Sequence, residues 1–71
     1  MIGKLVRHIE LDAIGIVVDH FVYSEFMGGY KVKFLKPVDT SKYAGYGSVM
    51  AGINNAVSNF EDNFEEVTND R

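Results

Sequence analysis

Hydrophobic and polar positions divide the chain into a β-patterned N-terminal part and a helix-patterned part that follows it. Residues 1–38 hold three runs that are rich in β-branched and aromatic residues and are bounded by Gly, Asp, Ser or Pro, a pattern typical of strands. The first run covers residues 4–11, the second covers 14–23, and the third begins at Tyr30 and ends before Pro37. This pattern predicts a three-stranded antiparallel β core over residues 1–38.

Alternation within the runs predicts which side chains face the core. The third run alternates most strictly, because its apolar residues fall on one phase and its lysines on the other. The apolar positions predicted to face inward are Leu5, Ile9 and Leu11 in the first run and Tyr30, Val32 and Phe34 in the third. The second run is apolar on both phases, which is typical of a strand that is covered on both sides or that crosses from core to interface.

From residue 48 the hydrophobic period changes to that of a helix. Five apolar residues recur at helical spacing over residues 48–60, and Ser48 is a suitable N-cap. These residues are Val49, Ile53, Ala56, Val57 and Phe60. The spacing therefore predicts a helix over 48–60 that packs on the sheet. Residues 64–68 either continue its apolar stripe or form a short closing strand, and periodicity alone does not separate the two.

Composition excludes several classes of protein. The chain has 71 residues with 46% hydrophobic and 13% aromatic content, which is too apolar for intrinsic disorder, so we expect one small folded domain. It has no Cys, which removes disulfides and thiolate zinc sites, and it has no apolar run long enough to span a membrane. We expect no cofactor, no metal and no membrane association, and a location in the cytoplasm or in a virion. Residues 61–71 form an acidic end.

Three segments of the N-terminal part resemble the first strands of small SH3-like barrels: Gly-Lys-Leu-Val-Arg at 3–7, Ile-Gly-Ile-Val-Val-Asp at 14–19 and Gly-Tyr-Lys-Val-Lys-Phe-Leu at 29–35. This group includes KOW-type and Tudor-like modules and many short proteins of tailed bacteriophages. The resemblance implies a bacteriophage origin and a short final strand that ends in an acidic–Val pair such as Glu66–Val67. The predicted helix departs from the pattern, because a compact barrel has a short loop and one strand there.

These patterns together define the expected fold. We expect a mostly β fold of the β-rich α+β type: a small SH3-like barrel or a curled antiparallel sheet of three to five strands. One helix is expected in the C-terminal half, lying across one face or end of the sheet.

The sequence contains no motif that points to catalysis. His8 and His20 are its two imidazoles, and Asp19 cannot share a metal ion with His20 from a regular strand, because neighbouring side chains point to opposite faces. Two His without a third spaced ligand also fall short of a zinc site. The chain has no nucleophile elbow, P-loop or dinucleotide-binding pattern. We therefore expect no enzyme activity.

Three groups of residues are candidates for binding. Aromatic residues and Met exceed what the predicted elements can bury, and both are enriched at the centres of protein interfaces. The protein-contact candidates are Phe21, Tyr23, Phe26, Met27, Tyr43, Tyr46 and Met50. The candidates for a basic strand that binds nucleic acid are Lys31, Lys33 and Lys36. The candidates for an acidic surface that mimics phosphates on a basic partner are Glu61, Asp62, Glu65 and Glu66.

The apolar surplus decides the functional prediction. We predict a non-enzymatic protein–protein interaction module, phage-encoded by resemblance, that binds and modulates a host protein or associates with itself as a homo-oligomer. One alternative is a KOW-like nucleic-acid-associated module. Alternation disfavours it, because the aromatic residues and lysines of the third run fall on opposite faces and the net charge is −3. The other alternative is a small structural component of a viral particle.

Overall fold

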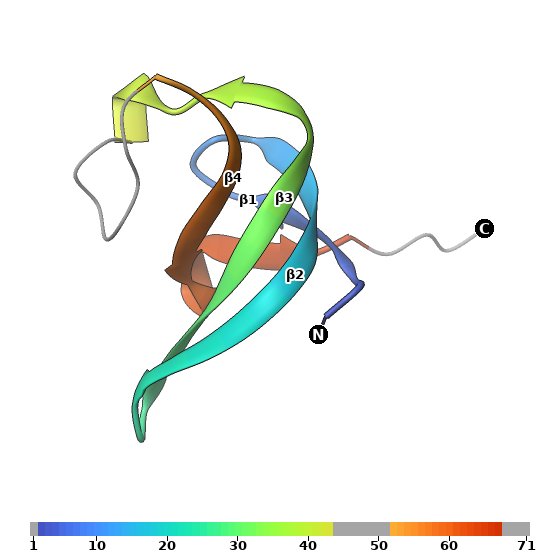
Figure 1. Ribbon diagram of the computed structural model, residues 1–71. Coiled ribbons are helices and arrows are strands. Elements are labelled where there is room, and N and C mark those ends of the chain that lie inside the picture. The colour runs from blue at the N-terminus through green and yellow to red at the C-terminus, as the bar shows by residue number, and fades with distance from the viewer. Residues whose placement is uncertain (1, 44–51, 68–71) are drawn as a thin grey trace.

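The computed structural model describes residues 2–43 and 52–67 (Figure 1). This part of the chain contains five strands and two short 3-10 turns. The strands are β1 (Leu5–His8), β2 (Ala13–Ser24), β3 (Met27–Asp39), β4 (Ile53–Phe60) and β5 (Phe64–Glu66), and the 3-10 turns are η1 (Ser41–Tyr43) and η2 (Glu61–Asn63). The fold is therefore mostly β, as the sequence predicts.

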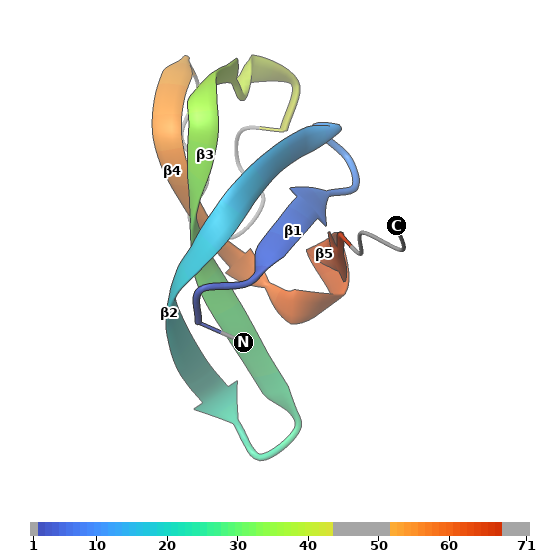
Figure 2. The same ribbon diagram turned by 90° about the vertical axis from the view of Figure 1, so that its right-hand side faces the viewer.

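The five strands form one antiparallel sheet in the order β4-β3-β2-β1-β5. The first four strands are consecutive neighbours, and β5 returns to pair with β1. Figures 1 and 2 show that the sheet curls strongly and that the β2–β3 hairpin extends beyond its neighbours as an arm. Within the described residues no ladder joins β4 to β5, so the curled sheet is not closed.

Each strand contributes to one hydrophobic core. Val17 of β2 lies opposite Val32 of β3, which in turn lies opposite Val57 of β4. The buried apolar residues are Val6, Val17, Val32, Phe34, Val57 and Phe64. The alternation predicted for the third run is confirmed, because its apolar phase packs in or against this core and its lysine phase is exposed.

The core phase predicted for the first run is wrong. Val6 and His8 are fully buried, Leu5 and Ile9 are exposed, and Leu11 packs only partly against the core. The strand is four residues long and the chain turns directly after it, so the three apolar residues never share one strand face. Alternation of apolar and polar residues assigns His8, as a polar residue, to the solvent-facing side. In the fold its side chain is buried.

The helix predicted over 48–60 is wrong for residues 53–60, which form β4, while residues 48–51 lie outside the described residues. Val57 and Asn59 are the buried positions of β4, two residues apart as in a strand. Val and Asn are poor helix formers, and the long neighbouring strand β3 offers this stretch a ladder of backbone hydrogen bonds. The chain continues through η2 into β5, so a short closing strand is the alternative that the structure contains.

The outer face of β2 is apolar but exposed, so β2 is not covered on both sides within the described residues. Its exposed apolar residues include Ile14, Ile16 and Val18. The inner face contains Gly15, where a Cβ would come within 2.5 Å of the backbone oxygen of Lys33 on β3. A glycine at this position therefore allows the close approach of the two strands.

Candidate functional site

Three aromatic rings pack together where the β2–β3 arm meets the end of β4. The rings of Phe21 and Tyr23 meet edge-on with centroids 4.8 Å apart, and the ring of Tyr23 lies 4.8 Å from that of Phe60. Phe21 lies over its ladder partner Gly29, where a Cβ would come within 2.5 Å of the ring. Because Gly29 has no side chain, the ring of Phe21 can lie against its backbone. Phe21, Tyr23 and Phe60 are termed the aromatic cluster below.

The end of the arm beyond the cluster is apolar and exposed to solvent. Phe26 is 91% exposed, its neighbour Met27 is also exposed, and so is Val22 on β2. The turn is fixed locally, because the N–H of Phe26 donates a hydrogen bond to Oγ of Ser24 over 3.3 Å. Val22, Phe26 and Met27 are termed the hairpin tip.

Two acidic residues border the hairpin tip. A small hollow of about 50 Å³ separates the tip from η2, and it is lined by Phe26, Met27, Gly28, Phe60, Glu61 and Asp62. The buried Oδ1 of Asn59 accepts hydrogen bonds from the N–H of Phe60, over 2.8 Å, and from the side-chain amide of Asn63. These bonds hold η2 beside the arm. Glu61 and Asp62 are exposed, so the apolar surface has a negative rim.

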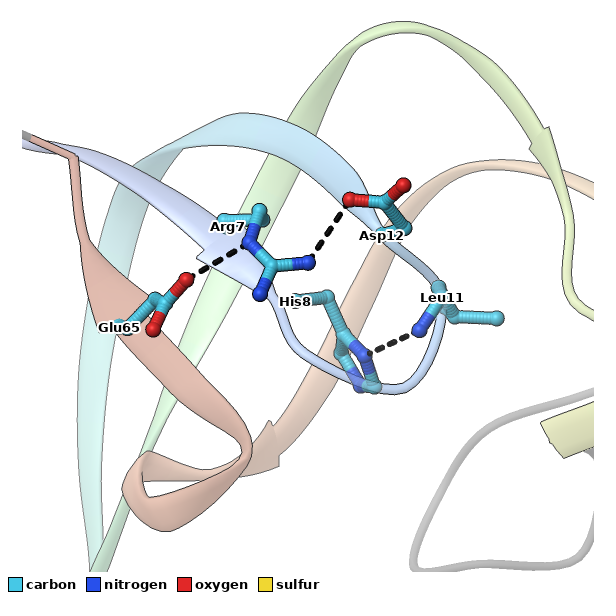
Figure 3. Close-up of polar contacts among 5 residues, drawn as sticks. All are labelled: Arg7, His8, Leu11, Asp12 and Glu65. Atoms are coloured by element: carbon cyan, nitrogen blue, oxygen red, sulfur yellow. Dashed lines mark hydrogen bonds and ion pairs between the residues drawn. The ribbon is translucent and has the colours of Figure 1, made fainter.

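The other two acidic candidates are engaged by β1. Oε2 of Glu65 accepts a hydrogen bond from Nε of Arg7 over 2.7 Å, and Nη1 of Arg7 donates to Oδ1 of Asp12 over the same distance (Figure 3). These two bonds raise the pKa of Arg7, that to Glu65 most strongly. Oε2 of Glu66 lies 3.7 Å from Nζ of Lys4. Glu65 and Glu66 therefore help to attach β5 and do not border the hairpin tip.

The structure gathers four of the seven residues predicted for protein contact at the arm: Phe21, Tyr23, Phe26 and Met27. Tyr43 lies in η1, beyond the opposite end of β3, whereas Tyr46 and Met50 lie outside the described residues. Phe60 is not among the predicted contact residues, because the apolar spacing over residues 48–60 assigns it to a helical stripe. A strand assignment for 53–60 would have identified Phe60 as a cross-strand neighbour of the arm.

The lysines predicted for nucleic acid do not form a stacking surface. Lys31 and Lys33 are exposed, on the opposite phase of β3 from Tyr30 and Phe34. Lys36 borders a separate groove of about 520 Å³ at the far end of β3. The apolar lining of this groove is Leu11, Ala13, Ile14, Leu35, Pro37 and Val38.

The two histidines are not brought together as a catalytic pair. His8 meets Phe64 edge-on at 5.1 Å, and its Nδ1 accepts a hydrogen bond from the N–H of Leu11 over 3.2 Å (Figure 3). Burial lowers the pKa of His8, so its ring is neutral at pH 7. The ring of His20 lies 5.6 Å from that of Tyr30, whose pKa is raised by burial. Among the described residues no group of three His, Asp or Glu could hold a metal ion.

Comparison with protein-family models, with curated proteins and with solved structures finds no match. Across residues 2–43 and 52–67, no helix is long and apolar enough to cross a membrane. Among the described residues, Phe26 at the hairpin tip is the most exposed large hydrophobic side chain.

Proposed function

We propose that the chain is a non-enzymatic protein-interaction module that binds another protein through the hairpin tip and the aromatic cluster. The observation that carries the proposal is the 91% exposure of Phe26 on an arm that projects beyond the rest of the sheet (Figure 1). An exposed phenyl ring contributes nothing to the core. Burial of such a ring against a partner stabilises a complex by about 2 kcal/mol.

The aromatic cluster supports the proposal because it gives the arm a rigid base. Its three rings are already in contact in the free chain, and Tyr23 is still 50% exposed. Side chains that are held in place before binding lose little conformational entropy on association. Aromatic anchors surrounded by weaker contacts are also the usual source of binding energy at interfaces.

The acidic rim specifies the chemistry of the partner. Glu61 and Asp62 border the hairpin tip, and none of the described cations forms an ion pair with them. A partner surface with an apolar pocket bordered by Lys or Arg matches this arrangement. Complementary charge at a rim mainly accelerates association and selects among partners. Binding is therefore expected to weaken, but not vanish, at high salt.

The finer fold and the origin are part of the same proposal. We place the chain with small SH3-like barrels of the kind found in tailed bacteriophages, where it would modulate a host protein. Support comes from the three N-terminal segments that resemble that group and from the short final strand that precedes Val67. The open edge between β4 and β5 is where the described sheet differs from a closed barrel.

The experiment that tests the function compares three tagged proteins: the natural chain, Phe26→Ala and Leu35→Ala. Leu35 is a matched control because it is 62% exposed and borders the groove at the far end of β3, away from the tip. Each protein is used to capture partners from a candidate host lysate after nuclease treatment, at two salt concentrations. Partners are identified by mass spectrometry.

We expect that the natural chain and Leu35→Ala both capture the same host protein. Phe26→Ala should capture about tenfold less of it. Retention by all three proteins, or by none of them, would contradict a role for the hairpin tip. Material that disappears with nuclease and falls steeply with salt would instead support the nucleic-acid alternative.

A further inference from the structure

β4 is an edge strand with one side of its backbone open. It pairs with β3, and within the described residues no strand pairs with its other side. Figure 1 shows β4 at the border of the sheet, on the side of β3 that faces away from β2. Unpaired N–H and C=O groups along such an edge are a template for another strand.

The sequence of β4 lacks the features that normally protect an edge. Ile53–Phe60 reads Ile-Asn-Asn-Ala-Val-Ser-Asn-Phe, with no Pro and no charged residue. The opposite edge differs, since β5 has only three residues and two of them are Glu. Short length and charge are the usual means of preventing edge-to-edge pairing. Within residues 2–43 and 52–67, one edge of the sheet is therefore protected and the other has no pairing strand.

The backbone of β4 is also regular over the segment that would pair with another strand. From Ala56 to Phe60 five consecutive residues pair with β3, and the register shift lies earlier, before Ala56. Bulges twist an edge away from a second strand, so an unbroken segment keeps it suitable for pairing. Ile53 is 70% exposed at one end of this edge, and the half-buried Phe60 lies at the other.

We propose that β4 pairs antiparallel with β4 of a second copy of the chain, around a two-fold axis, and so joins two sheets into one. An antiparallel self-pairing is isologous, and one edge therefore satisfies both copies. Pairing centred on Val57 sets Phe60 of each copy opposite Asn54 of the other, and it keeps Ala56 to Ser58 of the two copies together at the middle of the shared edge. This dimer does not depend on the hairpin tip, and its test is separate from that of the proposed function.

The charge of the chain supports a second copy as the partner that pairs with the open edge of β4. The chain carries a net charge of −3, which opposes the association of two copies in general. The β4 edge is neutral and meets an identical strand without like charges opposite each other. Pairing centred on Val57 also keeps the two Glu61 residues at opposite ends of the paired edge, about 27 Å apart at the rise of an antiparallel strand.

The decisive variant is Ser58→Asp. Ser58 lies opposite Lys31 in the ladder with β3, so an Asp there gains a favourable cross-strand partner within each copy. In the dimer the two Asp residues would be diagonal neighbours about 8 Å apart and would repel each other. Leu35→Asp is the matched control, because it adds the same charge at an exposed position away from the edge.

Light scattering coupled to size exclusion over a concentration series measures the association, and circular dichroism checks the fold of each variant. The proposal expects a dimer for the natural chain and for Leu35→Asp, and a dimer dissociation constant about tenfold higher or more for Ser58→Asp. Since the chain has no Cys, Ser58→Cys with a short bismaleimide provides an independent readout. Cross-linked dimer is expected at this position and not for Glu25→Cys in the β2–β3 turn. A natural chain that stays monomeric at its highest soluble concentration, or a dimer equally stable in Ser58→Asp, would overturn the proposal.

Discussion

Arg7 lies directly opposite Glu65 in the ladder between β1 and β5, and its Nε donates a hydrogen bond to Oε2 of Glu65 over 2.7 Å. The same guanidinium reaches Asp12 in the turn that follows β1. One side chain thus connects β1, the β1–β2 turn and the short strand β5. Because Asp12 and Glu65 are both exposed, salt screens this attraction.

Glu65→Gln is expected to lower the melting temperature, and the loss should shrink as salt is added. The variant removes the charge that Arg7 faces, but it keeps the shape of the side chain. Glu66→Gln is the control, since its carboxylate is 3.7 Å from an exposed Lys4 and makes no hydrogen bond to it. Thermal unfolding at two salt concentrations measures both variants. An equal loss for the two, or a loss for Glu65→Gln that salt leaves unchanged, would contradict a specific role for the Arg7–Glu65 pair.

Val32→Ala is expected to reduce the free energy of unfolding by about 2 kcal/mol, because Val32 is fully buried between Val17 and Val57 and leaves a cavity when truncated. Val22→Ala removes the same atoms from an exposed site. It should change the free energy of unfolding by no more than about 0.5 kcal/mol. Urea denaturation measures both. Similar effects of the two substitutions would show that the described core does not determine stability.

Gly15→Ala is expected to destabilise the sheet by about 1 to 3 kcal/mol. A methyl group at this position would come within 2.5 Å of the backbone oxygen of Lys33 and 2.6 Å of Cγ1 of Val32, so β2 and β3 would have to separate. Val18→Ala is an exposed comparison on the outer face of the same strand. Denaturation curves for the two variants decide the matter, and a neutral Gly15→Ala would mean that the strands are not so closely packed.

Acid is expected to weaken the fold through His8. Burial holds the pKa of His8 below its ordinary value of 6.5, so the unfolded chain binds a proton more readily than the folded chain does. The stabilisation by neutral His8 is fully present above the unfolded pKa, and it is lost as the pH falls through the lowered folded value. Asp39 acts at lower pH, since its hydrogen bonds with Ser41 lower a pKa whose ordinary value is 3.8.

Urea denaturation between about pH 8 and pH 5 measures this dependence. His8→Phe keeps a ring against Phe64 but cannot titrate, so its profile should be flatter than that of the natural chain. Val18→Ala, an exposed substitution that removes no titratable group, is the control and should keep the natural profile. A natural profile without any decrease, or a full decrease in His8→Phe, would assign acid sensitivity to other groups.

The sequence predicts the fold well where local pattern and tertiary packing agree. In β3 the strict alternation identifies Val32 and Phe34 as inward-facing, and both are buried. Prediction and structure disagree at β4. Ile53 and Val57 are four residues apart, a spacing that fits one face of a helix as well as one face of a strand. The choice between them depends on pairing with β3, and that pairing is not visible in a local window.

Packing between distant residues explains the other error. His8 is buried between Ala13 on the neighbouring strand β2 and Phe64 on β5, and Phe64 lies far away in the sequence. The candidate site also combines residues that are neighbours in the sequence with one that only the fold brings near. The residues of the hairpin itself, Phe26 and Met27 among them, could be chosen from composition and turn chemistry, whereas Phe60 joins them only through the fold.

The pairing of β1 with β5 has a consequence for how the chain folds during synthesis. His8 meets Phe64 across a span that includes every other strand, so this ladder forms only after residue 66 has left the ribosome. Contacts of such long sequence separation slow folding. The β1–β2 and β2–β3 hairpins can therefore form earlier, while the edge of β1 that pairs with β5 is still open. Until β5 pairs, the growing chain exposes that unpaired strand edge, a feature that makes folding intermediates prone to aggregation.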